Sequence, residues 1–137
     1  MKFKYRQIDI KNPFSKNKSI FRPIIPLSIG HKSVYIRFEA LIDSGADFSI
    51  FPLGIAKRLN IKPEGKERVY FSGVGDSLNE GFIAQVSITL DKDEIQTKII
   101  FSNSLEVDGI LGQHGFFDKF IVKFDLTEKE IDLTLRK

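Results

Sequence analysis

The stretch "FEALIDSGADFSIFP", residues 38–52, is the part of the sequence from which the fold is inferred. Residues 38–42 are typical of a strand that runs into the interior, and Asp43 ends that strand. Small residues follow at 44–46, and the chain becomes apolar again at Ile50. Asp-Ser-Gly is a common turn sequence. An ionised carboxylate at the end of a buried strand is costly, however, so the pattern also favours a chemical role for Asp43.

The composition is that of one ordinary globular domain. The chain has 137 residues, 42% hydrophobic and 28% charged, which is enough for a single core. The absence of cysteine excludes disulfides, thiolate metal sites and a cysteine nucleophile, and two histidines are too few for a histidine-rich metal centre. We therefore expect no metal and no other cofactor.

The charge and hydropathy pattern limits the choice of partners. The formal net charge is +3, and Lys and Arg are densest in the first 22 residues, which is weak support for a nucleic-acid partner; none is expected. The N-terminal segment has lysines but no continuous apolar core, so we infer no signal peptide. No apolar run reaches the roughly 18–20 residues that span a bilayer, so we expect no membrane partner and a cytoplasmic location.

Hydrophobic periodicity predicts a mostly β chain. Strands are expected at 4–10 and 33–42, with a turn-rich loop at 12–19 and a turn at 30–32. Residues 21–30 contain Pro23 and Pro26, which favours an edge strand there. We expect a single domain over residues 1–137, with residues 1–19 as an N-terminal strand and loop.

The rest of the chain continues the β pattern with short helical interruptions. A short helix is expected within residues 48–61, with Pro52 in its first turn. A long hairpin over 69–90 has a glycine-rich tip, another strand covers 94–102, and a second short helix is expected at 113–121. Two alternating strands flank a turn at 127–129.

An aspartate held on a tight turn can activate water, but hydrolysis of an amide also needs a proton donor. Two carboxylates that share one proton supply both functions, because close like charges cannot both ionise and the pair titrates as a unit. Gly45 would let the backbone approach a ligand closely, and the Ser44 hydroxyl could hold the loop by a hydrogen bond.

A second element follows about 65 residues later: "DGILG", residues 108–112. The order "ALIDSGA", glycine-tipped hairpin and "GILG" resembles the retropepsin-like aspartic proteases, the retroviral type with one lobe per chain, over roughly residues 20–135. The resemblance implies the acid-protease fold, a closed β-barrel or sandwich with one or two short helices. It also implies a flap hairpin at 70–82 and an apolar-apolar-Gly element with a short helix at 110–119.

The resemblance also implies roles for individual residues. Asp43 matches the catalytic aspartate, Ser44 the residue whose hydroxyl locks the two loops of a dimer, and Gly45 the glycine whose backbone lies against the substrate. The implied substrate-binding residues are Ala46, Asp47, Ser72, Gly73, Val74 and Gly75. Apolar pockets are expected, from position, at Ile50, Val74, Phe82 or Ile83. The sequence departs from the viral pattern at Gln113-His114, where viral members often have Arg-Asn or Arg-Asp, so the bracing of the dimer is open.

The sequence contains no second Asp-Ser/Thr-Gly, so a paired-carboxylate site requires a homodimer with one Asp43 from each copy. The prediction is an aspartic endopeptidase acting on polypeptides. The alternative is a dimerisation or peptide-binding module of the same fold with little or no proteolysis. "GDSL" at 75–78 lacks the chain position of a serine esterase motif, and "SGVG" lacks the following Gly-Lys-Ser/Thr of a phosphate loop.

Overall fold

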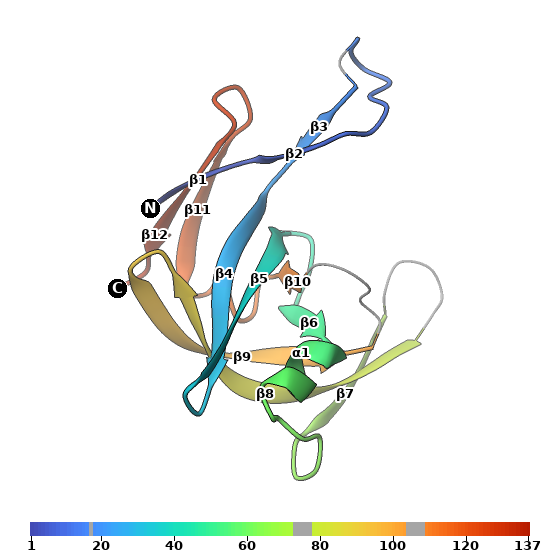
Figure 1. Ribbon diagram of the computed structural model, residues 1–137, viewed down its shortest axis with the longest axis vertical. Helices are drawn as coiled ribbons and strands as arrows, with labels where there is room; N and C mark the ends of the chain where they lie inside the picture. The colour runs from blue at the N-terminus through green and yellow to red at the C-terminus, as the bar shows by residue number, and fades with distance from the viewer. Residues whose placement is uncertain (17, 73–77, 104–108) are drawn as a thin grey trace.

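The computed structural model describes residues 1–16, 18–72, 78–103 and 109–137 (Figure 1). Its elements, in chain order, are β1 (Lys2–Lys4), β2 (Arg6–Ile8), β3 (Ile20–Arg22), β4 (Ile24–His31), β5 (Val34–Ile42), β6 (Ile50–Pro52), α1 (Leu53–Arg58), β7 (Arg68–Ser72), β8 (Leu78–Leu90), β9 (Asp93–Ser102), β10 (Gly109–Leu111), β11 (Phe120–Asp125) and β12 (Glu130–Leu135). The expectation of a mostly β chain with a short helix is confirmed. In the described parts, no helix has the length and apolar character needed to cross a membrane.

The main sheet closes on itself. Its strand order is β4-β5-β10-β6-β9-β8-β7, and a further pairing of β4 with β8 completes a barrel from which β7 extends as a flanking strand. The strands β8 and β9 form a long antiparallel hairpin, whereas β10 runs parallel to β5, with Leu111 opposite Ile42. This parallel pair matters for function, because it places the "ILG" element beside the end of the strand that leads to Asp43.

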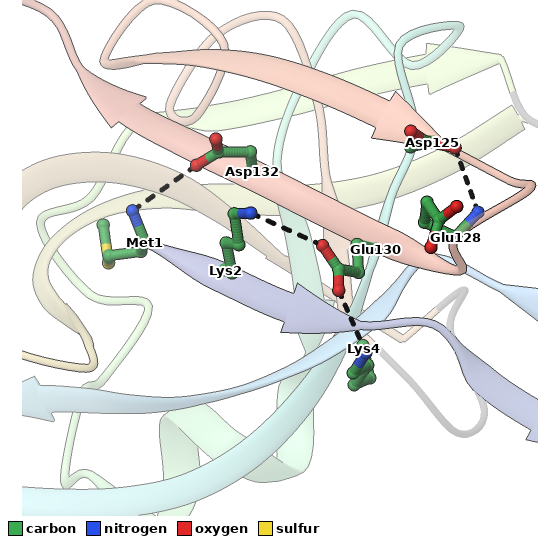
Figure 2. Close-up of polar contacts among 7 residues, drawn as sticks. All are labelled: Met1, Lys2, Lys4, Asp125, Glu128, Glu130 and Asp132. Carbon is green, nitrogen blue, oxygen red and sulfur yellow. Dashed lines mark hydrogen bonds and ion pairs between the residues drawn. The ribbon is translucent and has the colours of Figure 1, made fainter.

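A second, three-stranded sheet has the order β1-β12-β11. Its outward face carries alternating charges: Glu130 on β12 lies 3.0 Å from the ammonium of Lys4 and 3.7 Å from that of Lys2 (Figure 2). The hydrogen bond and charge of Lys4, reinforced by the charge of Lys2, lower the pKa of the Glu130 carboxyl below its ordinary value.

The core is rich in phenylalanine and isoleucine. Four phenylalanines are fully buried, and Phe116 packs against Phe120 with ring centroids 5.2 Å apart. The period-two pattern of β5 is also confirmed, since Ile36, Ala40 and Ile42 are buried on one face. The four phenylalanines are Phe51, Phe101, Phe116 and Phe120.

Several local expectations differ from the structure. The strand expected at 4–10 is two short strands, β1 and β2, and Pro52 ends β6 instead of lying in the first turn of α1. Pro23 and Pro26 were expected on an edge strand, but β4 is interior over Ser28–Gly30, where it pairs with both β5 and β8. The prolines are tolerated because they precede that doubly paired segment. The turn after β4 falls at Lys32–Ser33, both with positive φ, rather than at 30–32. Positive φ at both central positions is the backbone that a two-residue hairpin loop requires.

The second short helix, expected at 113–121, is replaced by consecutive hydrogen-bonded turns that lead into β11. The amides of Phe117 and Asp118 donate to carbonyls five residues earlier, at Gly112 and Gln113, which is wider than an α-helical turn. Gly115 has φ +101°, outside the helical region, and this interrupts the helix that the residue pattern suggested.

Candidate active site

Asp43 sits on a turn that is fixed directly to β10. It follows β5 immediately, and its amide donates to the Leu111 carbonyl at 2.9 Å, which extends the parallel β5–β10 pairing by one step. The Gly45 amide then donates to the Asp43 Oδ1 at 2.9 Å, and the Ala46 amide to the Asp43 carbonyl at 3.2 Å. The half-buried carboxylate is therefore held in one orientation by its own turn.

Glycine is favoured at residue 45 for a different reason from the backbone freedom that a tight turn suggested. Its φ does not lie in the left-handed region, so backbone freedom is not what selects glycine here. A Cβ at residue 45 would lie 3.3 Å from Asp43 Oδ1, which is a tight contact. Glycine thus leaves space beside the carboxylate, and its backbone is exposed.

A buried hydroxyl ties the end of the turn to the segment after β10. Ser49 is 1% exposed; its Oγ donates to the His114 carbonyl at 3.0 Å and accepts from the Gly112 amide at 3.0 Å. The His114 amide donates to the Asp47 carbonyl at 2.8 Å. These bonds join residues more than 60 positions apart in the chain, so the turn is built by the barrel and not by local sequence alone.

Gly112 is required by the same close approach. A Cβ there would clash with the Phe48 carbonyl oxygen and lie 2.7 Å from the Ala46 carbonyl oxygen. Both atoms are backbone, so no side-chain rotation relieves the contact. The glycine of the "GILG" element is therefore selected by the distance between two backbone segments.

Gln113 braces the turn within one chain. Its Nε2 donates to the Ser44 carbonyl at 2.7 Å, and its backbone amide donates to the Ala46 carbonyl at 2.9 Å. The sequence identified Gln113 only as a departure from the viral arginine. Its position directly after the glycine was the available signal, but the contact depends on a backbone fold that the sequence does not reveal.

The remaining predicted site residues are exposed, half-buried or outside the described residues. Ser44 is exposed, and among the described residues its hydroxyl has no hydrogen-bond partner. Ala46 is half-buried and Asp47 is exposed, both on the turn. Ser72 is exposed at the end of β7, whereas Gly73, Val74 and Gly75 lie outside the described residues.

An apolar cavity of about 270 Å³ lies between the turn and the β7–β9 strands. At its mouth the rings of Phe48 and His114 stack, with centroids 5.7 Å apart. Of the pocket residues expected by position, Ile83 lines the cavity, while Ile50 and Phe82 are buried and do not. The lining residues are Phe48, Ser49, Val69, Tyr70, Phe71, Ile83, Lys98, Ile99, Ile100 and His114. Within the described ranges, no group of His, Asp or Glu side chains is suited to hold a metal ion.

Comparison with known proteins agrees with this geometry. A family model described as "Aspartyl protease" matches residues 25–114, a range that runs from β4 to the stacked His114. Among curated proteins, no match was found.

The solved structures that resemble the chain carry related descriptions. EIAV protease, complexed with the inhibitor HBY-793, is 26% identical with a TM-score of 0.54, covering 67% of this chain and 82% of the protease. A retropepsin-like aspartic protease from Rickettsia conorii is 15% identical with a TM-score of 0.57, and the match covers 79% of this chain and 88% of that protein's chain. The retroviral protease-like domain of Ddi1 from Leishmania major is 18% identical with a TM-score of 0.58, and the match covers 82% of this chain and 87% of that domain's chain. The latter two likenesses concern the fold, and they confirm the expected acid-protease architecture.

Proposed function

The family model covers well over half of the chain, which therefore belongs to the aspartyl protease family, and on that premise we propose that it is an aspartic endopeptidase completed by a second copy of itself. The observation that carries the proposal is the Asp43 turn, with its carboxylate oriented by the Gly45 amide and its backbone fixed to Leu111. Such orientation is what a carboxylate needs if it is to activate water.

The sequence supports the homodimer by supplying only one such aspartate. Asp43 is the only aspartate of these 137 residues followed by Ser/Thr-Gly, and a second copy of the chain would supply the second carboxylate. On a two-fold axis the same residue of each copy meets its counterpart, which is the arrangement a shared proton requires. The Ser44 hydroxyl, exposed beside Asp43, would then bond to the loop of the partner subunit and lock the two turns together.

In the proposed reaction, one Asp43 carboxylate accepts a proton from a water that attacks the peptide carbonyl carbon. The other Asp43, protonated, donates its proton to the carbonyl oxygen, giving a neutral gem-diol. Collapse of the gem-diol breaks the C–N bond: the nitrogen takes a proton from the protonated Asp43 while one gem-diol hydroxyl gives its proton to the other Asp43, releasing a carboxylic acid and an amine. Each turnover uses one water and leaves the pair with one shared proton.

Substrate binding would involve the turn and the β7–β8 hairpin. The exposed Gly45 and Asp47 and the half-buried Ala46 would contact an extended peptide, and the hairpin, with Ser72 and residues 73–75, would act as a flap over it. Phe48 is five residues from Asp43, at most about 17 Å of extended chain. The cavity at Phe48 would therefore receive an apolar substrate side chain a few positions from the cleaved bond.

The test couples association with cleavage. Sedimentation across a concentration series and cleavage of a peptide library should be measured on the same samples, with Asp43→Asn as the inactive variant. Cleavage should rise with the dimer fraction and be abolished by Asp43→Asn without loss of dimer. Dimerisation and peptide binding without any cleavage would instead support the binding-module alternative.

A further inference from the structure

The first 22 residues carry a charge that the protease site does not use. These residues include seven Lys and Arg and one Asp, a net charge of +6. The rest of the chain has 14 Lys and Arg and 17 Asp and Glu, a net charge of −3. The basic segment forms β1, β2 and β3, and the loop between β2 and β3 projects away from the barrel (Figure 1). A strong local excess of one sign indicates an oppositely charged partner surface.

Three cations nearer the body of the protein are already paired. Lys2 and Lys4 contact Glu130, and Arg6 lies 2.9 Å from a Glu39 oxygen. The lysines of the projecting loop differ. Lys11, Lys16 and Lys18 are exposed, and the part of the chain that the structure describes provides no carboxylate partner for any of them.

These three lysines surround one hollow and flank an exposed aromatic side chain. The hollow has a volume of about 590 Å³. Phe14 beside it is 95% exposed and Ile10 is 41% exposed. The hollow is lined by Asp9, Ile10, Lys11, Asn12, Ser15, Lys16 and Lys18.

The loop presents Phe14 through its own hydrogen bonds. Asn12 Oδ1 accepts from the Phe14 amide at 2.9 Å, and Asn12 Nδ2 donates to the Ser19 carbonyl at 3.3 Å. At the base, the Lys129 ammonium lies 4.3 Å from the centre of the Phe21 ring, which anchors the hairpin to the β11–β12 turn. The outward position of Phe14 is therefore supported at both the tip and the base of the hairpin.

We propose that this hairpin docks on an anionic lipid bilayer, with Phe14 entering the interface and Lys11, Lys16 and Lys18 contacting lipid phosphates. An aromatic side chain on a projecting tip buries little area against a folded partner, but a bilayer can surround it completely. Juxtaposed lysines are attracted to the negative surface potential of anionic lipids. No apolar run of the sequence can span a bilayer, and docking at the surface requires none.

RNA is the less suitable partner for the same tip. Single-stranded nucleic acid binds in grooves where several bases stack on aromatic rings, whereas Phe14 is the only aromatic residue of the loop. The docking itself does not depend on proteolysis.

The experiment exploits the absence of tryptophan from the chain. Phe14→Trp introduces a single fluorophore at the tip, and Tyr35→Trp, at a site 57% exposed on the barrel, is its control. Each is mixed with neutral phosphatidylcholine vesicles, with vesicles containing about one third phosphatidylserine, and with single-stranded polyuridylate.

A second measurement compares the vesicle sedimentation of the wild-type chain with that of the loop triple variant, Lys11→Gln, Lys16→Gln, Lys18→Gln. The matched control, called the barrel triple variant, is Lys57→Gln, Arg58→Gln, Lys62→Gln, which removes the same charge from exposed positions in and just after α1.

The expected result is a blue shift in the emission of the Phe14→Trp variant with anionic vesicles and none with neutral ones. The loop triple variant should lose at least about tenfold in vesicle partitioning, and the barrel triple variant much less. Binding should also weaken when salt rises from about 0.1 M to about 0.5 M. Equal losses for the two triple variants, an unshifted emission of the Phe14→Trp variant, or tighter binding to polyuridylate than to anionic vesicles would each overturn the proposal.

Discussion

Replacing Gly112 by alanine tests the close approach that builds the candidate site. The added Cβ would clash with the Phe48 carbonyl oxygen and would lie 2.7 Å from the Ala46 carbonyl oxygen. In real proteins, Cβ atoms essentially never lie closer than 3.0 Å to a heavy atom outside the neighbouring residues. One of the two backbone segments must therefore move. Such a movement stretches the bonds from the Gly112 amide to Ser49 Oγ and from the Gln113 amide to the Ala46 carbonyl.

The magnitude follows from these contacts. Weakening two hydrogen bonds costs about 1 kcal/mol each, and overpacking strain adds about 1–3 kcal/mol, for a total of about 3–5 kcal/mol. For a chain of this size that lowers the Tm by about 10–20 °C. Gly54 provides the matched control, because it lies in α1 with nothing within 4 Å of an added Cβ. Gly54→Ala should be neutral or stabilising by up to about 1 kcal/mol.

The assay is thermal and urea denaturation of the wild type and the two variants, followed by peptide cleavage well below each Tm. Gly112→Ala should also lose cleavage in its remaining folded fraction, since the Asp43 turn is displaced. A Gly112→Ala protein with the Tm of the wild type and unchanged cleavage would refute the reasoning, because it would show that the two segments can separate at no cost.

Three further changes test other parts of the structure. Gln113→Glu keeps the size but points an oxygen at the Ser44 carbonyl, so kcat should fall by about 10- to 100-fold with KM nearly constant; steady-state kinetics showing wild-type kcat would contradict this. Phe116→Ala empties a fully buried ring site and should cost about 3–5 kcal/mol in urea denaturation; a loss below about 1 kcal/mol would show that the core refills the space. Because Lys4 lowers the pKa of Glu130, that ion pair stabilises the fold above the ordinary glutamate pKa and ceases to do so as the pH falls through the lowered value. The stability difference between the wild type and Glu130→Gln should therefore be present at neutral pH and vanish in acid; a difference that persists in acid would assign it to another cause.

The sequence was informative where local periodicity and local turns determine the structure. The alternation from Val34 to Ile42 predicts β5 and its buried face. The short helix was also predicted, although Pro52 ends β6 and caps α1 instead of standing in its first turn. The turn at Asp43 follows from the change from apolar strand to small residues. In each case the controlling interactions lie within a few positions of one another, which a single sequence can reveal.

Long-range contacts were the part that the sequence did not reveal. Pro26 suggested an edge because nothing local indicates that β8 pairs with β4 two residues later. The residues from 113 to 119 have helical spacing, but the backbone contact at Gly112 and the φ of Gly115 direct the chain into turns instead. The role of Gln113 depends on a partner 69 positions away, the Ser44 carbonyl.

The attachment of the Asp43 turn to β10 has a consequence for biosynthesis. Within the described part of the chain, the hydrogen bonds that fix residues 43–47 from outside come from residues 111–114, so a nascent chain that has not yet exposed them carries Asp43 on an unsupported loop. Contacts between such distant residues form late, because the intervening chain must first be ordered. The candidate site is thus assembled only after residues 111–114 have left the ribosome, so on the proposed function a shorter nascent chain could not cleave peptides.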